Sequence, residues 1–239
     1  MFKLKKQKDM NLYKDEAEIY SEFANSSFSW EFLEKPAFDY LFASLKKTNL
    51  KVLDAGCGGG RIIRYLIKRG ISPKNIVGQD ISPEMIKIAK KNFPKLSFIQ
   101  RNMRSTNLPR NSLDLITCTM AIHDLDEKDF RKTLKNFHRL LKDGGTFFYI
   151  VSHPIRVING NMNLYFNEGW QINKTPWGTK LPYFHRTVET YIKETTSAGF
   201  LIKNLYEPSL PLNSKKVDSK SYESYSKFPA RLVITAIKT

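Results

Sequence analysis

The stretch Val52-Leu53-Asp54-Ala55-Gly56-Cys57-Gly58-Gly59-Gly60 decides the fold of this chain of 239 residues. It predicts a strand over 51–55, a glycine-rich turn, and a helix that starts near Arg61. Glycines allow the backbone of such a turn to approach a ligand closely, and the start of the helix offers free N–H groups. The stretch therefore indicates a strand–turn–helix unit that binds a ligand.

The spacing of these glycines differs from that of an NAD-binding turn. The pattern G-x-G-x-x-G would need its third glycine at the position of Arg61. Asp54, directly before the turn, would repel a pyrophosphate but suits a ligand with a cationic amino-acid end. This combination favours an adenosyl amino acid over a dinucleotide.

Short strands alternate with helices through much of the chain, which is typical of a mainly parallel sheet covered by helices. Strands are expected over 51–55, 75–80, 96–100, 113–119, 146–152, 200–206 and 232–237. Helices are expected over 61–69, 82–93, 126–141 and 187–198, with Gly144-Gly145 ending the third of them. No long element is predicted for 153–186, and 209–228 is expected to be a polar loop.

Several of these segments resemble motifs of the class I S-adenosylmethionine-dependent methyltransferases, in particular the type 11, ubiquinone/menaquinone-biosynthesis-like group. Asp54-x-Gly56-x-Gly58-x-Gly60 is similar to the first motif of that family, and Val77-Gly78-Gln79-Asp80-Ile81-Ser82 to the second. Ser112-Leu113-Asp114-Leu115-Ile116 resembles the fourth strand, and Leu141-Lys142-Asp143-Gly144-Gly145 the turn before the fifth. The resemblance covers about residues 30–150.

The resemblance implies an α/β fold: a Rossmann-like, seven-stranded, mainly parallel sheet with helices on both faces and its last strand antiparallel. It implies a single methyltransferase domain over 1–239. Within it we expect an N-terminal helical cap, a cofactor-binding core, an aromatic lid insertion, and a C-terminal helix with strands. These parts cover 1–50, 51–152, 153–186 and 187–239.

The resemblance also implies S-adenosylmethionine as the cofactor. Asp54 would serve its methionine end, and Asp80 would accept hydrogen bonds from both ribose hydroxyls, as the two oxygens of a carboxylate can. Met85 would pack on adenine. Asn102 and Met103 stand where the family usually has an acid that accepts from the adenine amino group. The other residues expected around the cofactor are Gly56, Cys57, Gly58, Gly60, Ile81 and Thr119.

Three histidines are candidates at the reacting end, which the resemblance places at the carboxyl ends of the strands. Methyl transfer mainly requires an aligned nucleophile in a dry pocket, and a base helps only where the nucleophile carries a proton that must leave. His123, His153 and His185 lie at expected strand ends or in the lid. Asp124 or Asp126 would raise the pKa of His123. Each of the three also fits a purely structural role.

Aromatic side chains are dense in 153–186 and are predicted to form a lid over an apolar substrate or to pack an irregular insertion onto the sheet. They are Tyr165, Phe166, Trp170, Trp177, Tyr183 and Phe184.

The chain carries a net charge of +16, which attracts polyanions. Between Glu84 and Asp114 there is no acidic residue. That segment holds Lys87, Lys90, Lys91, Lys95, Arg101, Arg104 and Arg110. Because the basic residues are spread along the chain and their densest part lies on a helix that covers the sheet, we expect a solvated basic flank and no nucleic-acid substrate.

The composition also limits where the protein acts. No apolar run approaches the roughly 20 residues that a membrane helix needs, and Met1-Phe2-Lys3-Leu4-Lys5-Lys6 does not begin a secretory signal. Cys57 and Cys118 form no CxxC pattern, so we expect reduced thiols, no metal site and a cytoplasmic protein.

Three functions follow from this sequence. The first is methylation of O, N or C of a small molecule. The second is methylation of RNA or another polyanion, although the chain lacks the Asn/Asp-Pro-Pro-aromatic motif of amino-directed nucleic-acid methyltransferases. The third is a non-catalytic cofactor-binding protein. The nature of the cavity beside the methyl group would distinguish them.

Overall fold

The computed structural model describes residues 16–45, 49–175, 178 and 180–239. The start of the expected N-terminal cap and Trp177 lie outside these ranges.

A seven-stranded sheet forms the centre of the molecule, with the strand order β3-β2-β1-β4-β5-β9-β8. Strands β1 to β5 are parallel where they pair, and β9 runs antiparallel to both of its neighbours. The predicted fold class is thereby confirmed. The strands are β1 (Val52–Ala55), β2 (Ile76–Asp80), β3 (Ser97–Gln100), β4 (Leu113–Thr119), β5 (Leu141–Ser152), β8 (Phe200–Tyr206) and β9 (Arg231–Lys238).

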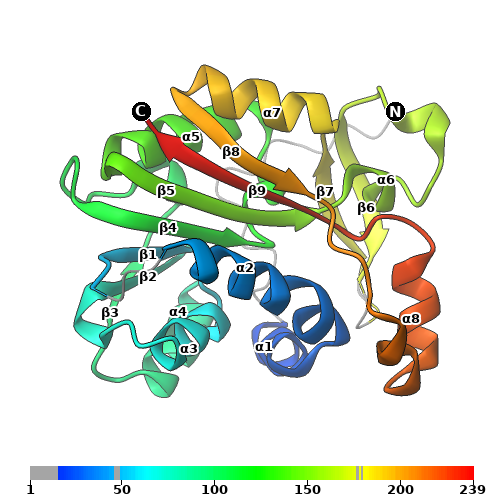
Figure 1. Cartoon of the computed structure of the whole chain (residues 1–239), viewed down its shortest axis with the longest axis horizontal. Helices are drawn as coiled ribbons and strands as arrows, with labels where there is room; N and C mark the ends of the chain where they lie inside the picture. The colour runs from blue at the N-terminus through cyan, green and yellow to red at the C-terminus, as the bar shows by residue number, and fades with distance from the viewer. Residues whose placement is uncertain (1–15, 46–48, 176–177, 179) are drawn as a thin grey trace.

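Helices cover both faces of this sheet (Figure 1). One face carries α5 (Glu127–Leu140) and α7 (Val188–Ser197). The opposite face carries α2 (Lys35–Leu45), α3 (Arg61–Lys68) and α4 (Pro83–Asn92).

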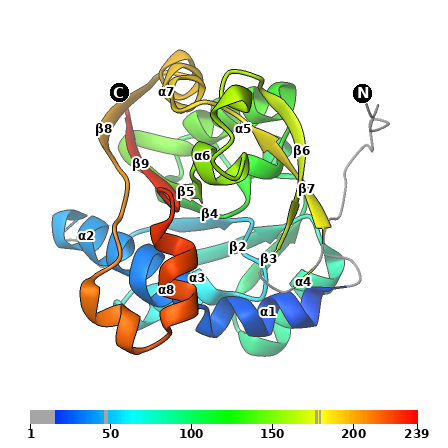
Figure 2. The ribbon, with the colours of Figure 1, turned by 90° about the vertical axis from the view of Figure 1, so that its right-hand side faces the viewer.

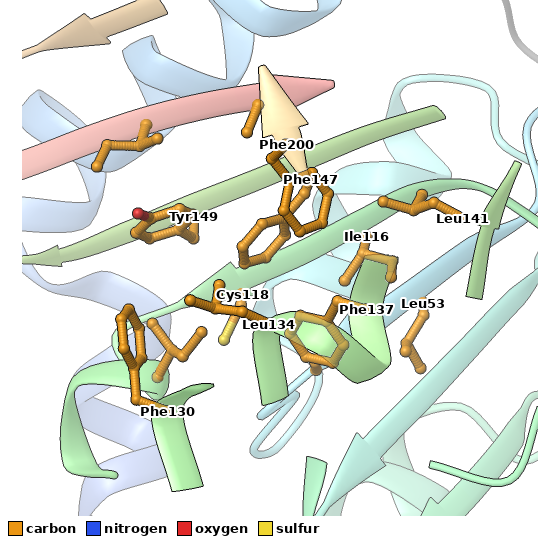
Figure 3. Close-up of a cluster of buried hydrophobic side chains, with 14 of the residues drawn as sticks. Leu53, Ile116, Cys118, Phe130, Leu134, Phe137, Leu141, Phe147, Tyr149 and Phe200 are labelled. Atoms are coloured by element: carbon orange, nitrogen blue, oxygen red, sulfur yellow. The ribbon is translucent and has the colours of Figure 1, made fainter. Parts of the chain in front are cut away.

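Each face of the sheet has its own hydrophobic core, because successive side chains along a strand point to opposite faces. In β5, Phe147 and Tyr149 point toward α5 and α7, whereas Phe148 and Ile150 point toward α2 and α3. Figure 3 shows the first core, where Phe137 of α5 packs edge-on against Phe147 with ring centroids 5.2 Å apart. Such buried aromatic packing holds the strands at fixed positions below the site.

Helix starts coincide with the side chains that cap them. Ser82 accepts from the Met85 N–H, and Asp126 accepts from the Asp129 N–H. Each satisfies one of the free N–H groups at a helix N-terminus. These caps are the reason why α4 and α5 begin where the sequence predicts.

Helix α5 ends within one residue of the expected position, but Gly144-Gly145 does not terminate it. The helix stops at Leu140, and β5 begins directly at Leu141. The pairing of β4 with β5 shifts register between Leu113 and Leu115, so the glycines lie inside an irregular start of the strand.

Further elements gather at the carboxyl end of the parallel strands (Figures 1 and 2). They are α1 (Ala17–Ser26), α6 (Pro154–Val157), β6 (Gly169–Lys174), β7 (Lys180–His185) and α8 (Ser219–Ser226). A π-helical turn covers Trp30–Glu34. Short 3-10 turns cover Pro73–Asn75, Met103–Ser105, Ile122–Asp124, Met162–Leu164 and Leu212–Lys216.

Two of the sequence expectations are wrong here. Strands β6 and β7 pair as an antiparallel hairpin within 153–186, where no such element was predicted. The region 209–228 contains α8, whose N-cap is Asp218, accepting from the Ser221 N–H. Neither β6 nor α8 contains a fully buried residue. Elements that bury so little carry no continuous apolar pattern by which the sequence could predict them. Within the ranges that the structure describes, no helix is both long enough and apolar enough to cross a membrane.

Candidate active site

The turn after β1 is tied to the end of β2. The N–H groups of Gly56 and Cys57 donate to the Gln79 carbonyl at 2.8 and 2.9 Å. Gly56 has a φ of +73°, and a Cβ there would lie 2.3 Å from the Cβ of Ala121. Only glycine therefore lets this turn pass so closely beneath the segment that follows β4.

Asp80 lies at the end of β2 and is held in place by the same turn. Its Oδ2 accepts from the Gly58 N–H at 2.8 Å, and its Oδ1 accepts from the Ser82 N–H at 2.9 Å. Burial raises the pKa of Asp80, and these backbone hydrogen bonds oppose the rise. Since each carboxylate oxygen has two lone pairs, each retains one for a ligand hydroxyl.

A cavity of about 160 Å³, here called the cofactor cavity, opens between these elements. Seven of the eleven residues predicted to contact the cofactor line it: Gly56, Gly58, Asp80, Ile81, Met85, Asn102 and Met103. It is also lined by residues that the sequence did not single out for the cofactor, among them Tyr20, Met120, Asp124, Asp129 and Trp170. They come from α1, the segment after β4, α5 and β6, and no spacing in the sequence links them.

Asp54 does not line the cofactor cavity but lies buried beneath the turn. Its Oδ1 accepts from the Thr117 hydroxyl at 2.9 Å, whereas its Oδ2 has no hydrogen-bond partner among the described residues. Burial raises the pKa of Asp54 to about 7. A buried carboxylate oxygen without a partner is unfavourable unless a ligand or water donates to it.

Of the other three residues predicted to contact the cofactor, two line a small neighbouring hollow and one lies at the start of α3. Cys57 and Thr119 line a hollow of about 20 Å³ that shares Tyr20, Gly56 and Gly58 with the cofactor cavity. The Thr119 hydroxyl is also buried without a hydrogen-bond partner in the described part of the chain. Gly60 lines neither space and instead caps α3 with a φ of +94°.

Asn102 already makes a structural contact, because its side chain accepts from the Arg104 N–H at 3.0 Å. Arg104 in turn forms an ion pair with Asp129 of α5. The cofactor cavity therefore does have a carboxylate near the end of β3, that of Asp129 in α5, but it is paired with Arg104. Sequence reasoning missed it because 25 residues separate the two partners.

A second cavity of about 700 Å³, here called the acceptor cavity, adjoins the first and shares Tyr20 and Met120 with it. Its walls come from α1, α6, the β6–β7 hairpin and α8, the group of elements that faces the viewer in Figure 2. Of the lid aromatics, Tyr183 lines this cavity and Trp170 lines the cofactor cavity, while Phe166 is 83% exposed.

His123 is the candidate histidine that lines the acceptor cavity. Its ring stacks on Tyr183, with centroids 5.6 Å apart and an interplanar angle of 13°. The expected rise in its pKa is wrong: burial, together with the charges of Arg231 and Arg186, lowers the pKa of His123 to about 3. Asp124 cannot offset this, since burial raises its own pKa well above the usual value and favours the neutral acid.

His153 and His185 line neither cavity. His153 caps α6, where its Nδ1 accepts from the Ile155 N–H at 3.2 Å, and its Nε2 lies 2.6 Å from Glu207. The Nε2 of His185 lies 2.8 Å from the Tyr165 carbonyl oxygen. Both contacts are those of structural residues that hold the segment after β5 and the hairpin.

The acceptor cavity is basic as well as aromatic: Tyr20, Phe23, Tyr183, Tyr225 and Phe228 are among its lining residues. Six cationic side chains line it: Arg61, Arg156, Lys174, Lys220, Lys227 and Arg231. Glu34 is the single acidic residue among the lining residues described. The expectation that the basic excess stays on a flank away from the reacting end is therefore incomplete, because the fold brings cations from five separate segments to this cavity.

The residues present fit the cofactor that the resemblance implies. Asp80 has lone pairs for two ribose hydroxyls, and the unpartnered Oδ2 of Asp54 would accept from a cationic amino group. A Cβ on Gly58 would lie within 4 Å of Tyr20 and Met85, so the missing side chain leaves room for the ligand. When bound, S-adenosylmethionine supplies an electrophilic methyl group on a sulfonium.

Comparison with known proteins agrees with this geometry. Residues 52–145 match a family described as the methyltransferase domain. A structure from Listeria monocytogenes, provisionally described as an S-adenosylmethionine-dependent methyltransferase, is 27% identical and superposes with a TM-score of 0.69 over 84% of this chain and 96% of its own. An S-adenosylmethionine-dependent methyltransferase from Mesorhizobium loti superposes with a TM-score of 0.71 at 23% identity, over 89% of this chain and 99% of its own.

Among relatives in sequence, a ubiquinone/menaquinone biosynthesis C-methyltransferase of Campylobacter jejuni is 30% identical over 115 residues. That match covers 46% of this chain and 48% of the relative, so this chain spans about half the length of the quinone methyltransferase.

Proposed function

Because this chain belongs to the class I S-adenosylmethionine-dependent methyltransferases, we propose that it methylates a small molecule bound in the acceptor cavity. The observation that carries the proposal is the acceptor cavity itself. Its volume of about 700 Å³ lies in the range of small-molecule sites, and it meets the cofactor cavity at Tyr20 and Met120. A methyl group presented at that junction would face the acceptor.

Residues 153–186 act as the lid over this acceptor. They contribute Arg156, Asn173 and Tyr183 to the acceptor cavity and Trp170 to the cofactor cavity. A segment that touches both ligands excludes water from the space between them, which methyl transfer from a sulfonium favours.

His123 positions the acceptor rather than deprotonating it. A base with a pKa near 3 takes up a proton poorly at neutral pH, although its neutral ring can accept a hydrogen bond. Its Nδ1 is buried without a hydrogen-bond partner among the described residues, so a donor group of the substrate that reached it would satisfy it. An acceptor that is already nucleophilic at neutral pH fits this site best.

Methylation of a polyanion is the second candidate, and the six cations of the acceptor cavity favour it. The two functions differ in where a labelled methyl group goes. Tritiated S-adenosylmethionine would be incubated with the protein and either an ultrafiltered small-molecule extract or purified RNA at physiological salt.

We expect label in the small-molecule fraction and none in RNA, and much slower transfer by the Asp80→Asn variant at a cofactor concentration near the Kd of the unchanged protein. Efficient labelling of RNA at physiological salt would refute the proposal and favour the second candidate. Contact through the basic flank alone would be sequence-independent and would fade as salt rises.

A further inference from the structure

Two arginines and a tyrosine form a layered group in the wall of the acceptor cavity. The Arg156 guanidinium lies 4.3 Å from the ring centroid of Tyr225, and the Arg231 guanidinium lies 5.5 Å from it. Arg156 follows β5, Tyr225 belongs to α8, and Arg231 begins β9. The group therefore fixes α8 against the end of the sheet and holds two cations close together.

The positive charge of this wall is only partly neutralised. Glu34 accepts from Arg231 at 2.7 Å, and its other carboxylate oxygen lies 3.8 Å from Arg61. Arg156 donates to the Ser224 carbonyl at 3.1 Å and forms no ion pair with the acidic side chains described. One carboxylate thus serves two arginines, while Arg156 has no counter-charge of its own.

Three lysines also line the acceptor cavity. They are Lys174 at the end of β6, Lys220 in α8 and Lys227 directly after α8. None of them forms an ion pair within 4 Å in the described ranges, although the charge of Lys220, after the hydrogen bonds from Ser221, lowers the pKa of the Asp218 carboxyl. Like charges gathered around one cavity repel each other and raise its affinity for an anion.

We propose that the methyl acceptor is a small anion whose carboxylate or phosphate group binds between Arg156 and the lysines of α8. This inference rests on the proposed function and names its substrate class. A guanidinium can bind a carboxylate or phosphate through two parallel hydrogen bonds, which orients the acceptor as well as holding it. Burial lowers the pKa of Arg156, which agrees with a cation that is partly removed from water.

The volume of the cavity decides between a small anion and a polyanion. A space of about 700 Å³ holds one drug-sized molecule, whereas a nucleic acid would need a charged surface that continues beyond the cavity. The exposed lysines of α4, such as Lys87 and Lys91, do not line the cavity.

The test uses two fluorescent probes that differ in one charged group. 8-Anilinonaphthalene-1-sulfonate carries a sulfonate, and N-phenyl-1-naphthylamine is the neutral counterpart. Each would be titrated into the full chain saturated with S-adenosylhomocysteine. The variants are Arg156→Gln and the double variant Lys220→Gln/Lys227→Gln. The matched control is Lys87→Gln/Lys91→Gln, which removes the same charge from α4.

We expect the sulfonate probe to bind about tenfold more weakly to Arg156→Gln and to the α8 double variant, since a hydrogen bond to a charged group contributes about that factor. The α4 control should bind it like the unchanged protein, and the neutral probe should bind all variants alike. The double variant keeps the test valid if Arg156→Gln loosens α8, because both of its lysines are exposed.

Equal binding of the sulfonate probe to all variants would overturn the inference, and so would an equal loss in the α4 control. Displacement of the probe by oligouridylate at a lower phosphate concentration than by uridine monophosphate would identify a polyanion site and would also overturn it. The proposed function is tested separately by the labelling experiment, so loss of transfer with intact probe binding would refute the function and leave the anion site standing.

Discussion

The predicted contact of Asp80 with the cofactor ribose is the sharpest point at which to test the site. In Asp80→Asn the shape of the side chain is kept, but the negative charge and one accepting oxygen are lost. That oxygen becomes an NH₂ group, which cannot accept from a ribose hydroxyl or from the N–H of Gly58 or Ser82.

The magnitude follows from the bonds involved. A hydrogen bond to a charged group contributes about 1.5–3 kcal/mol and a neutral one about 1 kcal/mol, so losing the charge and one acceptor for two hydroxyls weakens binding by roughly 2–3 kcal/mol. That is a rise in Kd of roughly 30- to 150-fold.

Calorimetric titration with S-adenosylhomocysteine measures this change directly. Asp114→Asn is the matched control, because Asp114 also accepts from a backbone N–H, that of Lys51 at 2.8 Å, but lies at the start of β4, at the opposite end of the sheet. Its affinity should stay within about twofold of the unchanged protein. An Asp80→Asn variant that binds as tightly as the control, with the same Tm, would refute the assignment of Asp80 to the ribose.

Three further outcomes are expected. Burial raises the pKa of Asp54 to about 7, so its carboxyl group ionises as the pH rises from about 6 to 8. The affinity for S-adenosylhomocysteine should therefore increase several-fold over that range in the unchanged protein and stay constant in Asp54→Asn. A parallel rise in both proteins would contradict the reasoning. The pKa of His123 near 3 keeps its ring neutral, so its NMR shifts should not change between about pH 5 and 8, and a midpoint near the usual value would count against the described burial. Hydrogen exchange over 153–186 should slow when S-adenosylhomocysteine and an acceptor analogue are both bound, whereas equal exchange would show that this segment is no lid.

Much of the fold is predictable from local sequence. The glycine turn, the caps at Ser82 and Asp126, and the period of two in β5 are short-range signals, and each corresponds to an element observed in the structure. The β6–β7 hairpin and α8 escaped prediction because neither is anchored by a continuous apolar face. They are held by contacts with distant segments, such as Asn173 of β6, which donates to the Val157 carbonyl at 2.6 Å.

The residues around the cofactor cavity also differ in whether a local sequence signal identifies them. Gly56, Gly58, Asp80 and Met85 lie on motifs where a strand end meets a helix start, so their spacing alone places them near one another. Tyr20 has no such signal, although it lines the cofactor cavity, the acceptor cavity and the small hollow beside them.

The sequence by itself determined the strands of the central sheet and the glycine turn after β1, because these depend on residues within a few positions of each other, and its motifs carried the resemblance that gave the class of chemistry. Only the tertiary structure decided the character of the acceptor cavity. Arg231 and Glu34 are 197 residues apart, and Arg156, Lys174 and Lys220 come from three further segments. Their joint charge depends on how α6, the hairpin and α8 pack around the strand ends. Burial likewise reversed the expected shift in the pKa of His123, because desolvation is a property of the assembled fold.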